Sequence, residues 1–240
     1  MPGSVKTEAI VLRSMRYGEA DRILHLYTPR RGRVSAIAKG VRKSRSRFGG
    51  RLEPFFRSDM VLHEGRSEML TVTSVSTVAH YARLREAAAP LDVAARCCDA
   101  VGRLFATDDP HPGVYHLLTN ELALLDADPA FATASNGVAF RLKLLLAAGI
   151  APQLSACASC GENEELVGFS GAAGGVVCGA CEAGSFRMDG AAHAFMVAAL
   201  GSPLAETPAV EPGALLQADR AVRETAEHHA HVRLGALVVR

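Results

Sequence analysis

The pattern of apolar and polar residues changes near residue 80, and it predicts a different type of secondary structure on each side. Before that point, apolar residues form short runs rich in β-branched side chains, with polar turns between them. The runs lie at residues 9–12, 23–27, 34–38, 55–62 and 70–78. Five short strands without a long helix predict a small barrel, and both an OB-fold and an SH3-like barrel fit this count.

Beyond Tyr81, apolar residues recur at helical spacing. The pattern predicts helices at residues 91–105, 114–125, 138–148, 191–200 and 214–232, and segments containing proline separate the first three of them. We therefore expect an α+β protein. A five-stranded barrel domain would occupy residues 1–80, and a helical domain would occupy residues 81–240.

Charge is divided unevenly between these two parts. The whole chain carries a formal net charge of only +1. Residues 1–80 hold 15 lysine and arginine residues against 7 acidic ones, a net charge of +8, whereas residues 81–240 hold 11 against 18, a net charge of −7. This asymmetry predicts that the first part binds a polyanion.

The positive charge is densest at residues 39–51, which we call the basic loop, between the third and fourth predicted strands. This segment has no acidic residue and six cationic ones, namely Lys39, Arg42, Lys43, Arg45, Arg47 and Arg51. A concentrated cationic loop in a nearly neutral chain indicates contact with the phosphates of nucleic acid. The alternative interpretation is a solvated segment with no ligand.

Aromatic side chains in the first part are candidates for stacking on bases. They are Tyr17, Tyr27, Phe48, Phe55 and Phe56. Strand aromatics usually belong to the core, and Phe48 lies within the basic loop. Phe48 is therefore the favoured stacking residue.

Four cysteines have the spacing of a metal site. Two C-x2-C pairs, with 17 residues between them, place the thiols at Cys157, Cys160, Cys178 and Cys181. This spacing favours one tetrahedral Zn²⁺ over the alternatives of two disulfides or unrelated buried thiols. Four thiolates leave no open coordination position, and residues 153–186 contain four glutamates but no lysine or arginine. We therefore expect one structural zinc ion, in an insertion at about residues 153–186 that does not contact DNA.

Several classes of protein are disfavoured by the sequence. No secretion signal or membrane-length apolar run is present, which favours a cytoplasmic protein without a membrane partner. Phosphate-binding loops, nucleophile elbows and H-E-x-x-H motifs are also absent, so we do not expect an enzyme. Two alternatives remain open: a zinc-ribbon protein associated with RNA or transcription, and an enzyme whose site assembles from scattered residues.

Several segments together resemble the RecO family of bacterial recombinational repair proteins. They lie at residues 17–23, 28–32, 38–45, 52–55, 140–145, 149–154 and 157–161, followed by Phe169, the glycines at 174 and 175, and the second cysteine pair. The resemblance implies an OB-fold, a helical domain and a zinc knuckle within the second part. The DNA-contacting motif of the family falls on Lys39, Arg42, Lys43 and Arg45.

The resemblance also implies a function. It implies binding to single- and double-stranded DNA, annealing of complementary strands, and association with the bacterial nucleoid during repair. It further implies that the protein works with RecR, and in many bacteria RecF, to load RecA. The tail of the single-stranded-DNA-binding protein is another implied partner, and Arg141 and Lys143 are candidates for the rim of its groove.

Overall fold

A computed structural model describes residues 3–43, 46–65 and 69–237. Contacts within the chain divide it into two compact units, Met1–Pro129 and Ala130–Arg240. In the described residues, no helix is both long enough and apolar enough to cross a membrane.

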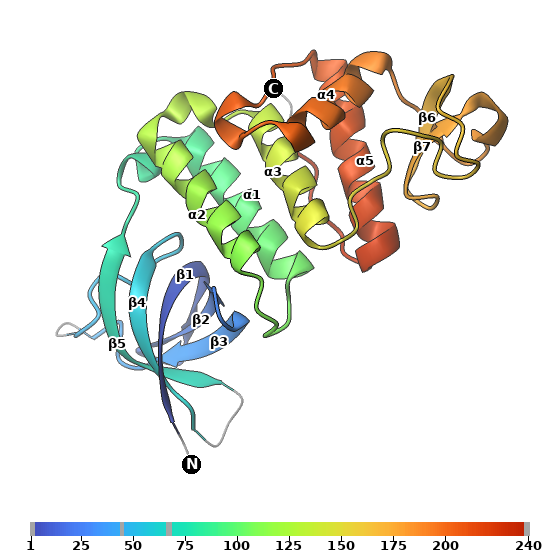
Figure 1. Ribbon diagram of the computed structural model, residues 1–240. Helices are drawn as coiled ribbons and strands as arrows, with labels where there is room; N and C mark the ends of the chain where they lie inside the picture. Colours follow the sequence, from blue (N-terminus) through green and yellow to red (C-terminus); the bar gives the residue numbers. More distant parts are fainter. Residues whose placement is uncertain (1–2, 44–45, 66–68, 238–240) are drawn as a thin grey trace. The chain divides into compact units, whose positions relative to one another are not determined.

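The first unit begins with a closed five-stranded barrel (Figure 1). Its strands are β1 (Ser4–Tyr17), β2 (Asp21–Thr28), β3 (Gly32–Ala38), β4 (Arg57–His63) and β5 (Leu70–Ala79). The order around the barrel is β1-β2-β3-β5-β4, and β3 and β5 form the parallel pair. This order is that of an OB-fold, so the five predicted strands and the α+β class are confirmed.

Alternation of side chains builds the barrel core. Along β3, buried and half-buried residues alternate without interruption, which directs Val34, Ala36 and Ala38 inward. The same cluster contains two residues from outside the strands, Phe48 and Leu52, both in the segment between β3 and β4. The barrel core therefore extends into the loop that connects these strands.

Two helices complete the first unit, α1 (Ala88–Leu104) and α2 (Pro112–Ala127). Proline at the first position of α2 suits a helix start, because its missing N–H would have no helical partner there. Phe105, at the end of α1, packs edge-on against Tyr27, with 6.5 Å between ring centroids. On α2, Tyr115 donates a hydrogen bond to Glu8, which also accepts one from Arg57 Nε at 2.7 Å.

The turn between β2 and β3 lies tightly against the segment between α1 and α2. Arg33 N donates to the Thr107 carbonyl at 3.0 Å. Gly32 adopts a φ of +54°, and a Cβ atom there would lie 2.1 Å from the carbonyl oxygen of Asp109. Only glycine satisfies both the backbone angle and this close approach.

The second unit contains α3 (Ala134–Ala147), α4 (Gly190–Gly201), α5 (Pro212–Ala230) and a small sheet (Figure 1). The sheet has the order β7-β6-β8, from β6 (Leu166–Ser170), β7 (Gly175–Cys178) and β8 (Phe186–Arg187). The five predicted helices are confirmed, with ends that differ by a few residues. Short 3-10 helices lie at Arg83–Arg85, Pro129–Phe131, Gly179–Cys181 and Leu204–Glu206.

A buried ion pair joins α3 to α5. Arg141 Nη1 lies 3.2 Å from Asp219 Oδ1, and both side chains are almost fully buried. Arg141 also donates to the Gly235 carbonyl at 2.8 Å, and Asp219 accepts from Arg223 Nε at 2.9 Å. These bonds satisfy charges that would otherwise be costly inside the unit.

Candidate nucleic-acid interface and metal centre

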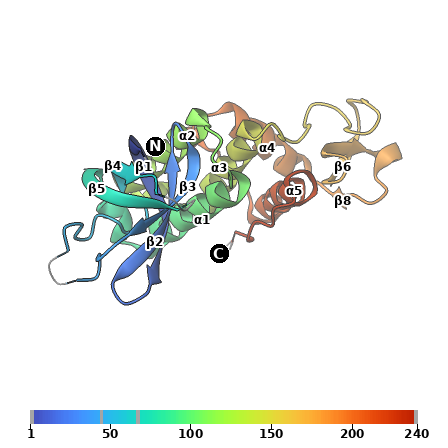
Figure 2. The ribbon, with the colours of Figure 1, turned by 90° about the horizontal axis from the view of Figure 1, so that it is seen from below.

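The basic loop leaves the barrel at the end of β3 and is held by both backbone and side-chain contacts. Arg42 N donates to the Ala20 carbonyl at 2.9 Å, and Gly40 N donates to Asp21 Oδ1 at 2.8 Å. Both acceptors belong to the turn between β1 and β2 or to the first residue of β2. Figure 2 shows this hairpin and the loop extending from the same side of the barrel.

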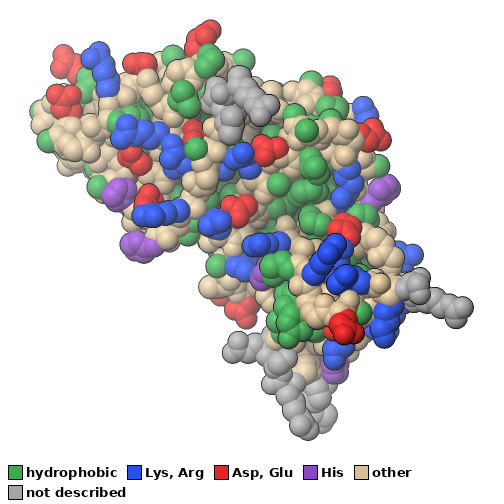
Figure 3. Space-filling model, turned by 180° about the vertical axis from the view of Figure 1, so that it is seen from behind, with side chains coloured by type: hydrophobic (Ala, Val, Ile, Leu, Met, Phe, Trp, Pro, Cys, Tyr) green, Lys and Arg blue, Asp and Glu red, His purple; other side chains and the backbone are tan. Residues whose placement is uncertain are grey.

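The cations of the basic loop are exposed. All five described cations (Lys39, Arg42, Lys43, Arg47 and Arg51) are in the exposed class, and within the described ranges none takes part in an ion pair. Arg45, also predicted to contact DNA, lies outside the described residues. Figure 3 shows lysine and arginine side chains spread over one face of the barrel. The positive charge of the loop is therefore available to an external anion.

Phe48 does not stack on bases, so the prediction for this residue is wrong. Only 1% of its surface is exposed, because the ring fills the barrel core between strands. Arg47 covers it from outside, with its guanidinium carbon 4.8 Å from the ring centroid. Phe48 anchors the loop, and its burial holds the neighbouring cations on the surface.

The structure separates a second group of arginines from the basic loop. Arg30 and Arg31 lie in the turn that joins β2 to β3, whereas Lys39 follows the other end of β3. Since a strand rises about 3.3 Å per residue, roughly 20 Å of strand separates the two groups. Arg31 also forms an ion pair with Glu64. The high charge of the first part thus belongs to more than one surface.

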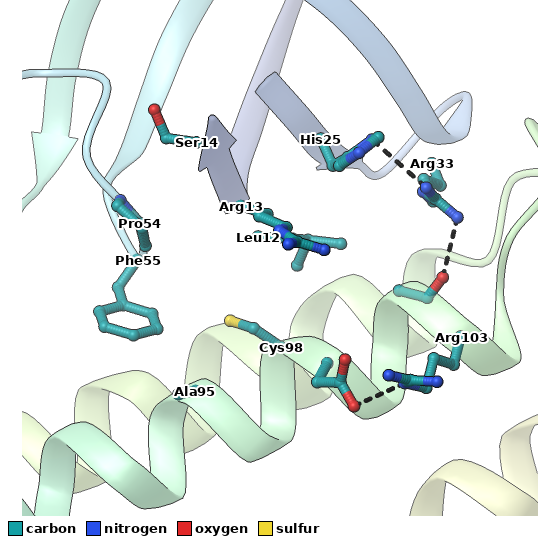
Figure 4. Close-up of a pocket in the computed structure, with 12 residues that line it drawn as sticks. Leu12, Arg13, Ser14, His25, Arg33, Pro54, Phe55, Ala95, Cys98 and Arg103 are labelled. Carbon is teal, nitrogen blue, oxygen red and sulfur yellow. Dashed lines mark hydrogen bonds and ion pairs between the residues drawn. The ribbon is translucent and has the colours of Figure 1, made fainter. Parts of the chain in front are cut away.

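A cavity of about 430 Å³ lies between the outer face of the barrel and α1 (Figure 4). Arg33 bridges it, donating from Nη1 to the Gly102 carbonyl at 3.0 Å and from Nη2 to His25 Nδ1 at 3.3 Å. Arg13 and Arg103 also line the cavity, and Asp99 forms an ion pair with Arg103. The lining carries more positive than negative charge, so its chemistry suits an anionic group.

The surroundings of His25 in this cavity favour its neutral form by lowering its pKa. Burial lowers its pKa from the ordinary value of 6.5, and the charges of Arg33 and Arg13 lower it further. Neutral imidazole can accept the hydrogen bond from Arg33. Sequence reasoning missed the cavity, because its residues come from five separate segments between Leu12 and Arg103 and share no motif.

The four predicted metal ligands lie together in the second unit. The sulfur atoms of Cys157, Cys160, Cys178 and Cys181 are all within 4.8 Å of one another, and we call this group the cysteine cluster. Cys160 Sγ and Cys178 Sγ are 3.7 Å apart, which excludes a disulfide between them. A tetrahedral ion with bonds of about 2.3 Å to sulfur requires neighbouring sulfurs roughly 3.8 Å apart. The cluster therefore can hold a metal ion.

Local backbone structure builds this cluster. Gly161 adopts a φ of +82°, and its N–H donates to the Cys157 carbonyl at 2.9 Å, which closes the first C-x2-C turn. Ala158 N donates to the Val176 carbonyl at 2.8 Å, so the first pair lies beside β7. The second pair begins at the end of β7 and continues into the 3-10 helix Gly179–Cys181.

The thiols differ in acidity. Backbone N–H groups of Cys178 and Cys160 lower the pKa of Cys157 to about 6. Hydrogen bonds with the thiols of Cys160 and Cys178 raise the pKa of Cys181 to about 12. Four thiolates this close repel one another, and a bound cation would relieve that repulsion.

Comparison with known protein families identifies the family. The family model "Recombination protein O N terminal" matches residues 1–81, and "Recombination protein O C terminal" matches residues 91–237. This chain belongs to the RecO family. The resemblance noted in the sequence is thereby confirmed, and it extends over both units.

Curated RecO relatives are similar over most of their length. The DNA repair protein RecO of Anaeromyxobacter sp. strain K is 38% identical over 240 residues, covering 97% of this chain and 94% of that protein. The RecO of Thermobifida fusca is 41% identical and covers 81% of each chain. The RecO of Rubrobacter xylanophilus is 40% identical over 73% of this chain and 71% of that protein.

One predicted contact of RecO type is wrong in this chain. Arg141 was expected at the rim of a groove for a partner's tail, but it is 3% exposed and bonded to Asp219. A rim residue has to reach solvent, and Arg141 does not. Lys143, two residues along α3, donates from Nζ to the Leu200 carbonyl at 3.1 Å.

Proposed function

We propose that this protein binds single- and double-stranded DNA through the basic loop and anneals complementary strands. The observation that carries the proposal is the exposure of all five described loop cations on a segment anchored by buried Phe48 and Leu52. Cations held in place by a packed core lose less conformational freedom on binding than those of an unanchored segment.

Phosphates are the groups that such a loop recognises. Lysine and arginine side chains displace condensed counterions from the DNA backbone, and this release favours binding. Phosphate contacts carry no base information, so binding is independent of sequence. The same contacts lower the repulsion between two strands, which allows complementary bases to pair without any covalent step.

The salt dependence of DNA affinity tests this proposal. The double variant Arg42→Ala/Lys43→Ala removes two phosphate contacts. The slope of log affinity against log salt should become shallower by about 1.4 on single strands and about 1.8 on duplex. The slope is measured by anisotropy of labelled DNA across a salt series.

A control of equal charge change makes this test specific. Arg96→Ala/Arg233→Ala also removes two positive charges, but Arg96 pairs with Asp92 and Arg233 pairs with Glu227, both outside the loop. The control should keep the slope of the parent protein. An unchanged slope in the loop variant would show that another surface binds DNA.

The cysteine cluster holds one structural Zn²⁺ in this proposal. Four sulfur ligands and tetrahedral spacing support zinc, and the absence of an open ligand position argues against a catalytic ion. The glutamates between residues 153 and 186 would repel phosphate, so the ion stabilises the second unit and does not contact DNA.

We also propose that the chain consists of a barrel domain at residues 1–80 and a helical domain at residues 81–240.

The partners proposed are RecR, RecF, RecA and the tail of the single-stranded-DNA-binding protein, with work at the bacterial nucleoid. Membership in the RecO family supports them. Annealing of complementary strands coated with single-stranded-DNA-binding protein, with and without RecR, tests the partnership. We expect this protein to increase the rate of annealing, and we expect the addition of RecR to change that rate further. An annealing rate that neither protein changes would refute the proposed partnership.

A further inference from the structure

Tyr17 differs from the other aromatic residues of the barrel in its exposure. It is the last residue of β1, and 53% of its surface is exposed. The other three tyrosines of the chain, Tyr27, Tyr81 and Tyr115, are all buried, and tryptophan is absent. A single exposed aromatic is ordinary on a protein surface, so its neighbours decide whether it has a role.

The neighbours of Tyr17 belong to the region that holds the basic loop. Tyr17 is directly opposite Asp21 in the β1–β2 pair. The same Asp21 accepts the hydrogen bond from Gly40 N, and Ala20 accepts the one from Arg42 N. The ring and the first cations of the loop are therefore tied to one turn.

Charge near this turn is mostly positive. Lys39, Arg42 and Lys43 enter from the loop and are exposed, and Arg16, also exposed, lies on the face of β1 opposite to Tyr17. On the acidic side, Glu19 lies exposed in the turn and Asp21 bonds to the loop backbone. Arg22, opposite Arg16, is neutralised by Glu53 at 3.0 Å.

The outer face of the barrel continues from this ring. Alternation along β1 places Tyr17 on the same face as Met15 and Arg13. Met15 and its cross-strand partner Ile23 are half-buried and apolar, and Arg13 lines the cavity next to α1. A partly apolar face thus lies between two cationic regions, an arrangement suited to bases flanked by phosphates.

We infer that Tyr17 stacks on a base of single-stranded DNA whose phosphates contact the basic loop, and that it makes the protein prefer single strands over duplex. This inference rests on the proposed function, because the loop has to bring the strand to the ring. In duplex the bases are already stacked on one another and their faces are not available. The basic loop would therefore bind both single-stranded and duplex DNA, whereas Tyr17 would add affinity only for single-stranded DNA.

Binding to labelled oligothymidine and to a blunt duplex of equal length tests the inference in the full chain. Tyr17→Ser should weaken oligothymidine binding about 5- to 100-fold and change duplex binding less than twofold. Tyr17→Phe keeps the ring and should retain affinity for both. Equal melting temperatures of the three proteins check that the hairpin remains folded.

Tyrosine emission supplies a second readout. Without tryptophan, emission arises from the four tyrosines, and Tyr17 is the exposed one. Saturating oligothymidine should quench part of the emission of the parent protein, and this change should be absent in Tyr17→Phe although the DNA still binds.

The results separate this inference from the proposed function. Unchanged oligothymidine binding in Tyr17→Ser overturns the inference, as does equal loss on single strands and duplex, or equal loss in Tyr17→Phe. If Arg42→Ala/Lys43→Ala weakens both DNA forms in the same experiment, the loop proposal stands even when the role of Tyr17 fails. If that variant changes nothing, the loop proposal fails by itself.

Discussion

The five described cations of the basic loop lie in solvent without ion-pair partners, whereas the four thiols of the cysteine cluster lie within 4.8 Å of one another. The loop is held by apolar anchors and keeps its charge for an external ligand. The cluster has only a few apolar neighbours, and its sulfurs would repel one another as thiolates. Under the proposed function, the exposed cations of the loop serve an external ligand, whereas the crowded thiols of the cluster serve an internal metal ion.

Loss of the proposed zinc ion should have the largest effect on stability, and it should affect the second unit without affecting the barrel. Structural zinc contributes about 10–16 kcal/mol to the folding of isolated zinc-finger peptides. We expect Cys160→Ser, or a chelator, to expose residues 153–187 to hydrogen exchange while the barrel keeps its protection. Exchange followed by mass spectrometry measures both regions in one sample.

A matched control for this prediction is Ser159→Ala, which changes an exposed residue between the first two cysteines. It should behave as the parent protein does. Equal exchange in the parent and Cys160→Ser proteins would show that the cluster does not stabilise its unit.

Loss of the Phe48 ring tests the apolar side of the comparison. Phe48→Ala leaves a cavity in the barrel core and should lower the free energy of unfolding by about 4 kcal/mol. Arg47→Ala, at the exposed neighbouring position, removes only the guanidinium that covers the ring and should lower it by about 0.5 to 1 kcal/mol. Urea unfolding measures both, and similar midpoints for the two variants would contradict an anchoring role for Phe48.

The buried ion pair between Asp219 and Arg141 should contribute to the stability of the second unit. Asp219→Asn leaves Arg141 buried with an incomplete partner and should cost about 3 kcal/mol. Glu227→Gln breaks only the exposed pair with Arg233 and should cost less than about 0.5 kcal/mol. Both are read from urea unfolding. A cost for Asp219→Asn as small as that of the control would mean that the buried pair is dispensable.

Substitution of Glu8 should have the smallest effect on the free energy of unfolding, and the size of this effect should depend on pH. Burial acts to raise its pKa, but hydrogen bonds from Arg57 and Tyr115 outweigh burial and lower it below the ordinary value of 4.5. Its stabilisation is therefore complete above pH 4.5 and is lost as pH falls through the lowered pKa. Glu8→Gln should cost about 1 to 2 kcal/mol at neutral pH.

The pH profile is the measurement that checks this expectation. Unfolding of the parent and Glu8→Gln proteins is compared from pH 7 down to pH 3. The gap between them should narrow in the acidic range, because the parent loses the same carboxylate by protonation. If the difference in unfolding free energy between the two proteins stays constant as pH falls, the loss of stability in Glu8→Gln comes from packing and not from the carboxylate charge.

The sequence was sufficient for features that depend on local spacing. Alternating runs predicted the strands, and the C-x2-C pairs predicted which thiols would meet. The length of β1 was not predictable, because its apolar pattern ends at Leu12 while the strand continues to Tyr17 through pairing with β2. Long-range contacts were also hidden: the partner of Arg141 lies 78 residues away, at Asp219.

Phe48 and Tyr17 show the same limit in different ways. A phenylalanine among cations is expected at the surface, but the loop returns Phe48 to the barrel core. Tyr17 lies beyond the end of the predicted strand, so the sequence pattern alone did not distinguish it from the other candidate aromatics, whereas the fold extends β1 to Tyr17 and leaves its ring exposed. Which aromatic residue reaches solvent is decided by tertiary packing, which spacing along the chain does not record.

The close approach at Gly32 determines where a stable fragment of this chain can end. A fragment that ends near residue 81 would lose Thr107 and Asp109, against which the turn at Gly32 lies. It would also lose Phe105, so the ring of Tyr27 would become exposed to water. A fragment through Pro129 keeps all of these surfaces covered. It is the appropriate minimal piece for isolating the barrel for spectroscopy or crystallisation.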